Sequence, residues 1–176
     1  MFPFRKRTDP RAEAAAALYE TIVAVARQPV FYAEYGVPDT IDGRFDMVTL
    51  HAALVIHFLG TAGESGHKLS QQLFDTMFRD FMQNLRQVGI GDLSIARHFH
   101  RMAAGFNGRA RAYAPALAGH NGAAITAAVA RNVYRTPDAP HAAALGNYMF
   151  RQFEHLATVG TDRLLSGQLL FLPVLG

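Results

Sequence analysis

Residues 73–93 read LFDTMFRDFMQNLRQVGIGDL, and the spacing of their apolar side chains decides the fold. At about 100° per residue, the apolar positions from Leu73 to Leu85 gather on one half of a helical wheel, and the polar ones on the other. This division predicts an amphipathic helix with one face in a core. Gly89 stands where a helix commonly ends in a left-handed residue. Asp92 is expected to cap the next helix, so the stretch is predicted to form a helical hairpin.

The same helical periodicity extends over most of the chain. Helices are expected at 11–28, 46–59, from 73, from 92, at 110–117, at 121–135 and at 141–158. The helix at 46–59 is apolar almost all round, which predicts a buried central position. Gly60, Gly63 and Gly66 are expected to end it. Residues 30–45 are expected to form a turn-rich connection with room for a short helix, and the apolar C-terminal tail is expected to dock on the body. The predicted fold is all-α, a single compact domain of about six or seven helices over 11–176, after a basic flexible N-terminus at 1–10.

Composition excludes several classes of protein. The 176 residues contain no cysteine, which excludes a disulfide framework, a thiolate zinc site and a cysteine nucleophile. No apolar run approaches the roughly 18 residues that a membrane-spanning helix needs. The expected location is the cytoplasm, peripheral to the inner membrane in a bacterium, or the matrix side in a mature mitochondrial form.

The acidic side chains of the opening stretch do not form a catalytic pair. Asp75 and Asp80 are five positions apart, which places them about 140° apart around a helix. Asp75 precedes Arg79 by four residues, the spacing of an intrahelical ion pair. No nucleophile elbow or phosphate-binding loop is present either. The sequence therefore predicts a protein without enzymatic activity.

The eight histidines do not form a recognisable metal site. His98 and His100 are two positions apart, so one helix cannot direct both to one ion. Glu64 and His67 match a Glu-x-x-His element, but no second copy exists and the pair falls in a glycine-rich segment that is expected to be a turn. His51 is expected, with His57, to be a core histidine with a backbone partner. No metal and no cofactor are predicted.

Positive charge is concentrated in two segments. Residues 1–11 carry a local charge of +3 and residues 86–111 one of +4, so the remainder carries −4. One interpretation of the second segment is a solvated helix face whose acidic neighbours come from other elements. The other is a docking surface for an anion, which can be ribosomal RNA, lipid head groups or an acidic protein.

Two blocks of sequence carry a resemblance to a known family. They are GRFDMVTLHAALVIHFL and LSQQLFDTMFRDFMQNLRQVGIGDLSIARHFHRMAAGFNGRARAY. Together they resemble the ubiquinol–cytochrome c chaperone family, whose members are assembly factors for cytochrome b of the respiratory bc1 complex. The likeness is strongest over residues 18–117.

The resemblance implies a non-catalytic assembly chaperone for cytochrome b that binds the newly made client near the membrane surface. It also implies a small partner subunit, a contact with the ribosome and no DNA partner. The charged side chains expected to contact partners are Asp75, Arg79, Asp80, Arg86, Asp92, Arg97, Arg101 and Arg109. The alternative is an RNA- or ribosome-binding module that uses the basic segment at 86–111.

Overall fold

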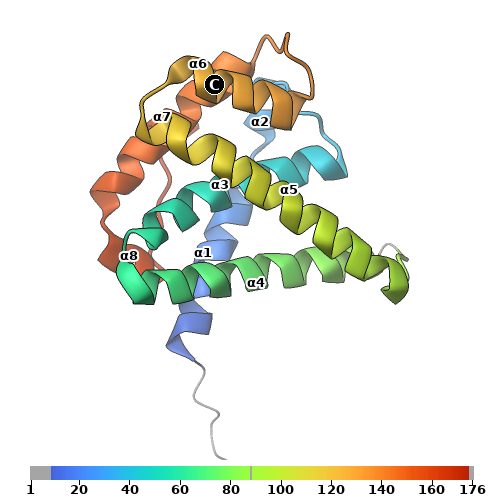
Figure 1. Cartoon of the computed structure of the whole chain (residues 1–176), viewed down its shortest axis with the longest axis vertical. Coiled ribbons are helices and arrows are strands. Elements are labelled where there is room, and N and C mark those ends of the chain that lie inside the picture. The colour runs from blue at the N-terminus through green and yellow to red at the C-terminus, as the bar shows by residue number, and fades with distance from the viewer. Residues whose placement is uncertain (1–8, 88, 175–176) are drawn as a thin grey trace, which may run out of the picture.

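The computed structural model describes residues 9–87 and 89–174, apart from the side chains of residues 92 and 93. Over these residues all regular structure is helical, which confirms the predicted all-α class (Figure 1). The elements are α1 (Pro10–Ala26), α2 (Pro29–Ala33), α3 (Ile41–Gly60), α4 (Gly63–Gln87), α5 (Asp92–Ala118), α6 (Gly122–Val129), the π-helix η1 (Ala130–Tyr134), α7 (Ala142–Val159) and α8 (Thr161–Leu165). The single compact domain follows from their packing around one core.

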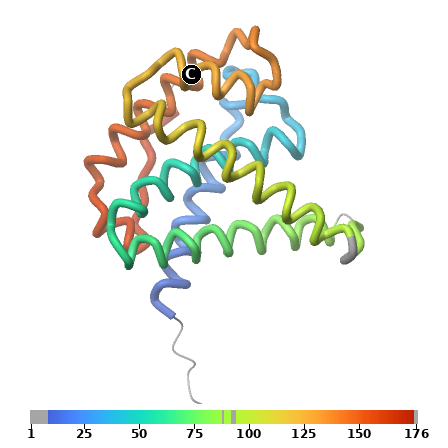
Figure 2. The backbone as a smooth tube through the Cα atoms, in the orientation of Figure 1, coloured from blue at the N-terminus to red at the C-terminus, as the bar shows by residue number. Residues whose placement is uncertain are grey.

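The core is built around α3. Every residue from 46 to 55 is buried, and the helix contacts α1, α4, α5, α7 and α8. A helix that is enclosed on all sides needs apolar side chains all round, and this is the pattern that predicted its central place. The tube in Figure 2 follows α3 through the middle of the molecule, with the other long helices around it.

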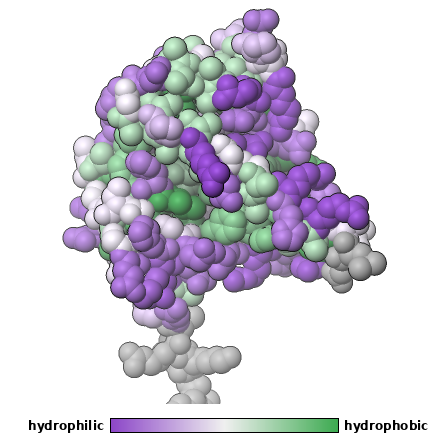
Figure 3. Space-filling view, in the orientation of Figure 1, coloured by the Kyte–Doolittle hydropathy of each residue, from purple (hydrophilic) through white to green (hydrophobic). Residues whose placement is uncertain are grey.

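The predicted hairpin of α4 and α5 is confirmed. The two helices meet at their connection and diverge from it (Figure 1). Phenylalanine rings join them, since Phe78 lies 5.3 Å from Phe99 and 6.4 Å from Phe106 between centroids. Figure 3 shows hydrophobic side chains in the angle between these helices and hydrophilic ones over α4.

The junction between α3 and α4 differs from the prediction. α4 begins at Gly63, ten residues before the expected start, so Glu64 and His67 lie on a helix and not in a turn. Gly66 permits this arrangement, because a Cβ there would lie 1.8 Å from the carbonyl oxygen of Leu59. The glycines therefore mark a close passage between two helices, and only Gly63, at φ +63°, needs the left-handed region.

Two further boundaries also differ. α5 runs unbroken through Gly105 and Gly108, where a break was expected, and continues through Pro115 to Ala118. Internal glycines each cost only about 1 kcal/mol relative to alanine, which the burial of residues such as Tyr113 outweighs. The helix expected at 121–135 is α6 followed by η1, and it ends at Arg135, whose φ of 58° is left-handed.

The C-terminal segment docks on the body, as predicted. Phe171 is buried beside the ring of His51, with 5.2 Å between centroids. The side chain of Gln152 on α7 holds the same segment by two hydrogen bonds, donating to the carbonyl of Leu172 and accepting from its amide, each at 2.9 Å. Phe171 is thus part of the core, whereas its neighbour Leu170 is 70% exposed.

Candidate functional site

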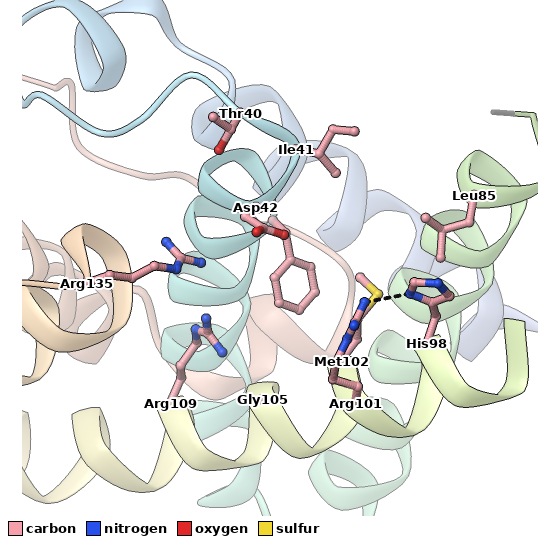
Figure 4. A pocket seen from close by; sticks show the side chains of 11 residues that line it. Thr40, Ile41, Asp42, Leu85, His98, Arg101, Met102, Gly105, Arg109 and Arg135 are labelled. Atoms are coloured by element: carbon pink, nitrogen blue, oxygen red, sulfur yellow. Dashed lines mark hydrogen bonds between the residues drawn. The ribbon is translucent and has the colours of Figure 1, made fainter. Parts of the chain in front are cut away.

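A concave site lies where the start of α3, the end of α4 and the first half of α5 approach one another. Its cavity measures about 710 Å³. Figure 4 shows basic side chains from α5 and from the end of η1 directed into it. The lining residues are Thr40, Ile41, Asp42, Phe45, Leu85, His98, Arg101, Met102, Gly105, Arg109 and Arg135.

The inner wall of the cavity rests on a buried carboxylate. Asp46 has no exposed surface and lies 2.6 Å from Nη2 of Arg109 and 2.8 Å from Nη2 of Arg135. Burial raises the pKa of Asp46, and the two guanidinium groups oppose that rise. Two positive charges therefore share one negative charge, which leaves the wall with a net charge of +1.

The position of Arg109 is fixed on two sides. Its guanidinium lies 5.7 Å from the centroid of the Phe45 ring, within the range of a cation–π contact. A Cβ at Gly105 would approach its Nη1 to 2.8 Å, so the missing side chain leaves room for the guanidinium. Arg109 was predicted to contact a partner, but the structure also gives it an internal role.

Arg101 is an exposed cation that lines the cavity. Its guanidinium donates a hydrogen bond to Nδ1 of His98 at 2.7 Å, which requires that this nitrogen carry no proton (Figure 4). No carboxylate among the described residues pairs with Arg101. Arg97, one turn earlier, is also exposed but does not line the cavity.

A second cavity of about 260 Å³ continues the first. Four residues line both cavities, and all four are apolar: Ile41, Phe45, Leu85 and Met102. The second cavity adds Val48 and Phe81 to the apolar wall, and Arg27 and Arg44 at its edge. We call the two cavities together the α3–α5 groove.

The acidic residues predicted on α4 have separate surroundings. Asp80 accepts hydrogen bonds from the hydroxyl of Tyr19 on α1 at 2.7 Å and from Asn84 at 3.2 Å. Asp75 accepts one from Gln71 at 2.7 Å and not from the expected partner, Arg79. Asp80 therefore ties α1 to α4, whereas Asp75 is an exposed residue with a local bond.

The remaining predicted positions lie outside the groove lining. Arg79 and Arg86 are exposed on α4. The side chain of Asp92 falls outside what the structure describes. Its backbone begins α5, with Gly91 in the N-cap position, so the expected cap is displaced by one residue.

The prediction of a core histidine is confirmed at His51. Its ring is fully buried, with Nδ1 2.7 Å from the carbonyl of Met47 and Nε2 2.7 Å from the hydroxyl of Tyr148. Burial lowers the pKa of His51 to about 4. His57 is only half-buried and contacts the rings of Phe58 and Phe153, and desolvation also lowers its pKa.

The described residues offer neither a cluster of metal ligands nor a membrane-spanning helix. They contain no group of three or more histidine, aspartate or glutamate side chains placed to hold a metal ion. Glu64, half of the Glu-x-x-His element, pairs with Lys68 one turn later. None of the helices in this part of the chain is long and apolar enough to cross a bilayer.

Sequence reasoning missed two residues that build the site. Asp46 was placed in an apolar helix without a partner, and Arg135 lies 89 positions away at the end of a π-helix. A signal for the first did exist, because an aspartate in a run of buried residues requires a cation. Nothing in the sequence indicated which arginine would supply it.

Comparisons with known proteins agree with the resemblance. The model of the family described as ubiquinol-cytochrome C chaperone matches residues 33–171. Among solved structures, that of the Cbp3 homolog from Brucella abortus matches with a TM-score of 0.85 and 33% identity, over 97% of this chain and 94% of that chain. No curated protein matches the chain significantly. The match over most of the sequence shows that the chain belongs to the ubiquinol–cytochrome c chaperone family.

Proposed function

We propose that this protein is a non-catalytic assembly chaperone for cytochrome b of the respiratory bc1 complex. The match of the family model over residues 33–171 carries the proposal. The described geometry is consistent with it, since Asp75 and Asp80 engage different partners and do not converge on one site. The client is newly made cytochrome b or another bc1 assembly client, bound by the chaperone at the periphery of the membrane.

The test is deletion of the gene in its native host. We expect lower steady-state levels of cytochrome b and of assembled bc1 complex, because an unassembled hydrophobic subunit is exposed to aggregation and proteolysis. Re-expression of the wild-type chain should restore both levels. Normal cytochrome b and bc1 levels in the deletion strain would contradict the proposal.

Affinity capture from membranes at low salt identifies the proteins that bind this chain. A small partner subunit and a ribosomal contact are further proposals, which the same capture tests by identification of the co-purifying proteins. The alternative of an RNA-binding module gains no support from the comparisons. Its basic segment also loses part of its free charge, because Arg109 is engaged by Asp46.

A further inference from the structure

The α3–α5 groove has an apolar floor that is recessed. Phe45, Phe81, Leu85 and Met102 are all half-buried, and only Ile41, with 75% of its surface exposed, protrudes at the edge. Insertion into a bilayer requires protruding apolar side chains. A recessed floor instead receives apolar side chains from a convex partner, as a groove between helices receives an amphipathic helix.

Positive charge surrounds this floor on both sides. Arg27 and Arg44 lie at one end, and Arg101, Arg109 and Arg135 at the other. Three carboxylates offset these five arginines. Asp39 pairs with Arg44, Asp46 lies beneath Arg109 and Arg135, and Asp42 lines the cavity. The groove therefore keeps a net positive charge of +2.

Arg101 provides the point of recognition. Its only described hydrogen bond is to an uncharged histidine nitrogen, so its charge has no counter-ion among the described residues. A guanidinium at the mouth of an apolar groove binds a carboxylate more strongly than one in open solvent does, because the surrounding surface lowers the effective dielectric.

We propose that the α3–α5 groove binds an amphipathic helix of another protein, with its apolar side chains on the recessed floor and a carboxylate at Arg101. This deepens the proposed function, because it names the chemistry of the segment that such a chaperone holds. A partner helix that fits this groove has apolar residues at i, i+3 or i+4 spacing, which form a stripe along one face. It also has an acidic residue beside that stripe.

The test is binding of a fluorescent helical peptide with a leucine stripe and one glutamate beside it, compared with the same peptide carrying glutamine. We expect the wild-type chain to prefer the glutamate peptide by about tenfold. Arg101→Gln should abolish this preference and leave the affinity for the glutamine peptide unchanged. Arg97→Gln, on the same helix but outside the groove, is the matched control and should change neither affinity.

The apolar half of the proposal is tested separately. Ile41→Ser should lower the affinity for both peptides by a similar factor, about threefold to tenfold, because it removes apolar contact and no charge. Ile41 and Arg101 are both exposed, so Ile41→Ser and Arg101→Gln should keep the wild-type melting temperature. If Arg101→Gln and Arg97→Gln lowered the affinity for the glutamate peptide equally, the groove would not be the binding site.

Binding to other anionic partners in place of the peptide would contradict the proposal. Binding to vesicles of anionic phospholipid, or to a single-stranded RNA, with loss in Arg101→Gln and no binding of either peptide, would overturn the proposal. A strain expressing the double variant Ile41→Ser, Arg101→Gln separates the two proposals. Normal cytochrome b in that strain overturns the role of the groove and leaves the assembly function intact. Normal cytochrome b in the deletion strain contradicts the assembly function itself.

Discussion

Arg109 on α5 donates to Asp46 on α3 across 2.6 Å, and this contact links the wall of the groove to a carboxylate with no exposed surface. Arg135, from the end of η1, approaches the second oxygen of Asp46 at 2.8 Å. Three segments that are distant in sequence therefore meet at one charge. The contact between Arg109 and Asp46 holds the wall of the groove in place, because separating these two largely buried groups would leave Arg109 without a counter-ion.

Asp46→Asn should destabilise the fold strongly. The change leaves the guanidinium of Arg109, whose side chain is only 16% exposed, without its counter-ion. Removal of one partner of a buried pair costs about 3–5 kcal/mol, and we expect the lower end because Arg135 is 47% exposed and can turn to solvent. The measurement is the free energy of unfolding in urea.

Asp42→Asn is the matched control for this change. Asp42 lines the same cavity and lies on the same helix, but it is exposed. We expect the free energy of unfolding to fall by no more than about 0.5–1 kcal/mol, because a carboxylate in the first turn of α3 interacts favourably with the helix dipole. Equal losses in the two variants would show that Asp46 does not carry the role given to it.

Asp80→Ala should lower the free energy of unfolding by about 1–3 kcal/mol. The variant leaves the hydroxyl of Tyr19 on α1, a mostly buried residue, without the carboxylate that it now contacts at 2.7 Å. Asp75→Ala, on the exposed side of the same helix, should change it by no more than about 0.5 kcal/mol. A similar effect of both substitutions in urea unfolding would refute the structural role of Asp80.

The sequence predicted the parts of the fold that depend on local periodicity. The amphipathic pattern after Leu73 identified α4 and its turn into α5, and the apolar run after Asp46 identified the buried helix. The prediction from periodicity failed where a glycine either ends a helix or allows two helices to pass closely. Gly66 was taken to end a helix, whereas it allows the backbone of Leu59 to approach, and such a contact is not a local property of the chain.

The candidate site was less predictable for the same reason. Arg101 and Arg109 were identified from the clustering of charge, but the sequence could not show that Arg109 pairs with a buried carboxylate and Arg101 does not. That difference depends on Asp46 and Arg135, which approach through tertiary packing. The apolar floor was also hidden, because Phe45, Leu85 and Met102 come from three helices and each belongs to a different periodic pattern.

Gly66→Ala should disrupt the passage of α4 over the end of α3. The added Cβ would lie 1.8 Å from the carbonyl oxygen of Leu59, so the backbone must shift. We expect a loss of at least about 2 kcal/mol in the free energy of unfolding, typical of overpacking against a rigid group. Gly60→Ala provides the comparison, because a Cβ there meets nothing within 4 Å. It should leave stability unchanged or raise it by up to about 1 kcal/mol.

Acidification should destabilise the protein through His51. Burial lowers the pKa of His51 from 6.5 to about 4 in the folded state, so as the pH falls the unfolded chain binds the proton first. The stabilisation is complete above about pH 6.5 and is lost as the pH falls toward 4, a total of about 3 kcal/mol. The measurement is the urea midpoint from pH 4 to pH 7.

Variants of the two histidines separate their contributions. His51→Gln should be less stable at pH 7, because it perturbs the contacts with Met47 and Tyr148, and its stability should depend less on pH. His57→Gln should keep most of the wild-type slope, since His57 is half-buried and faces Phe58 and Phe153 without a charged neighbour in these ring contacts. If the slope survives in His51→Gln and disappears in His57→Gln, the half-buried histidine is the acid-sensitive group, and the buried contact with Tyr148 does not control stability in this range.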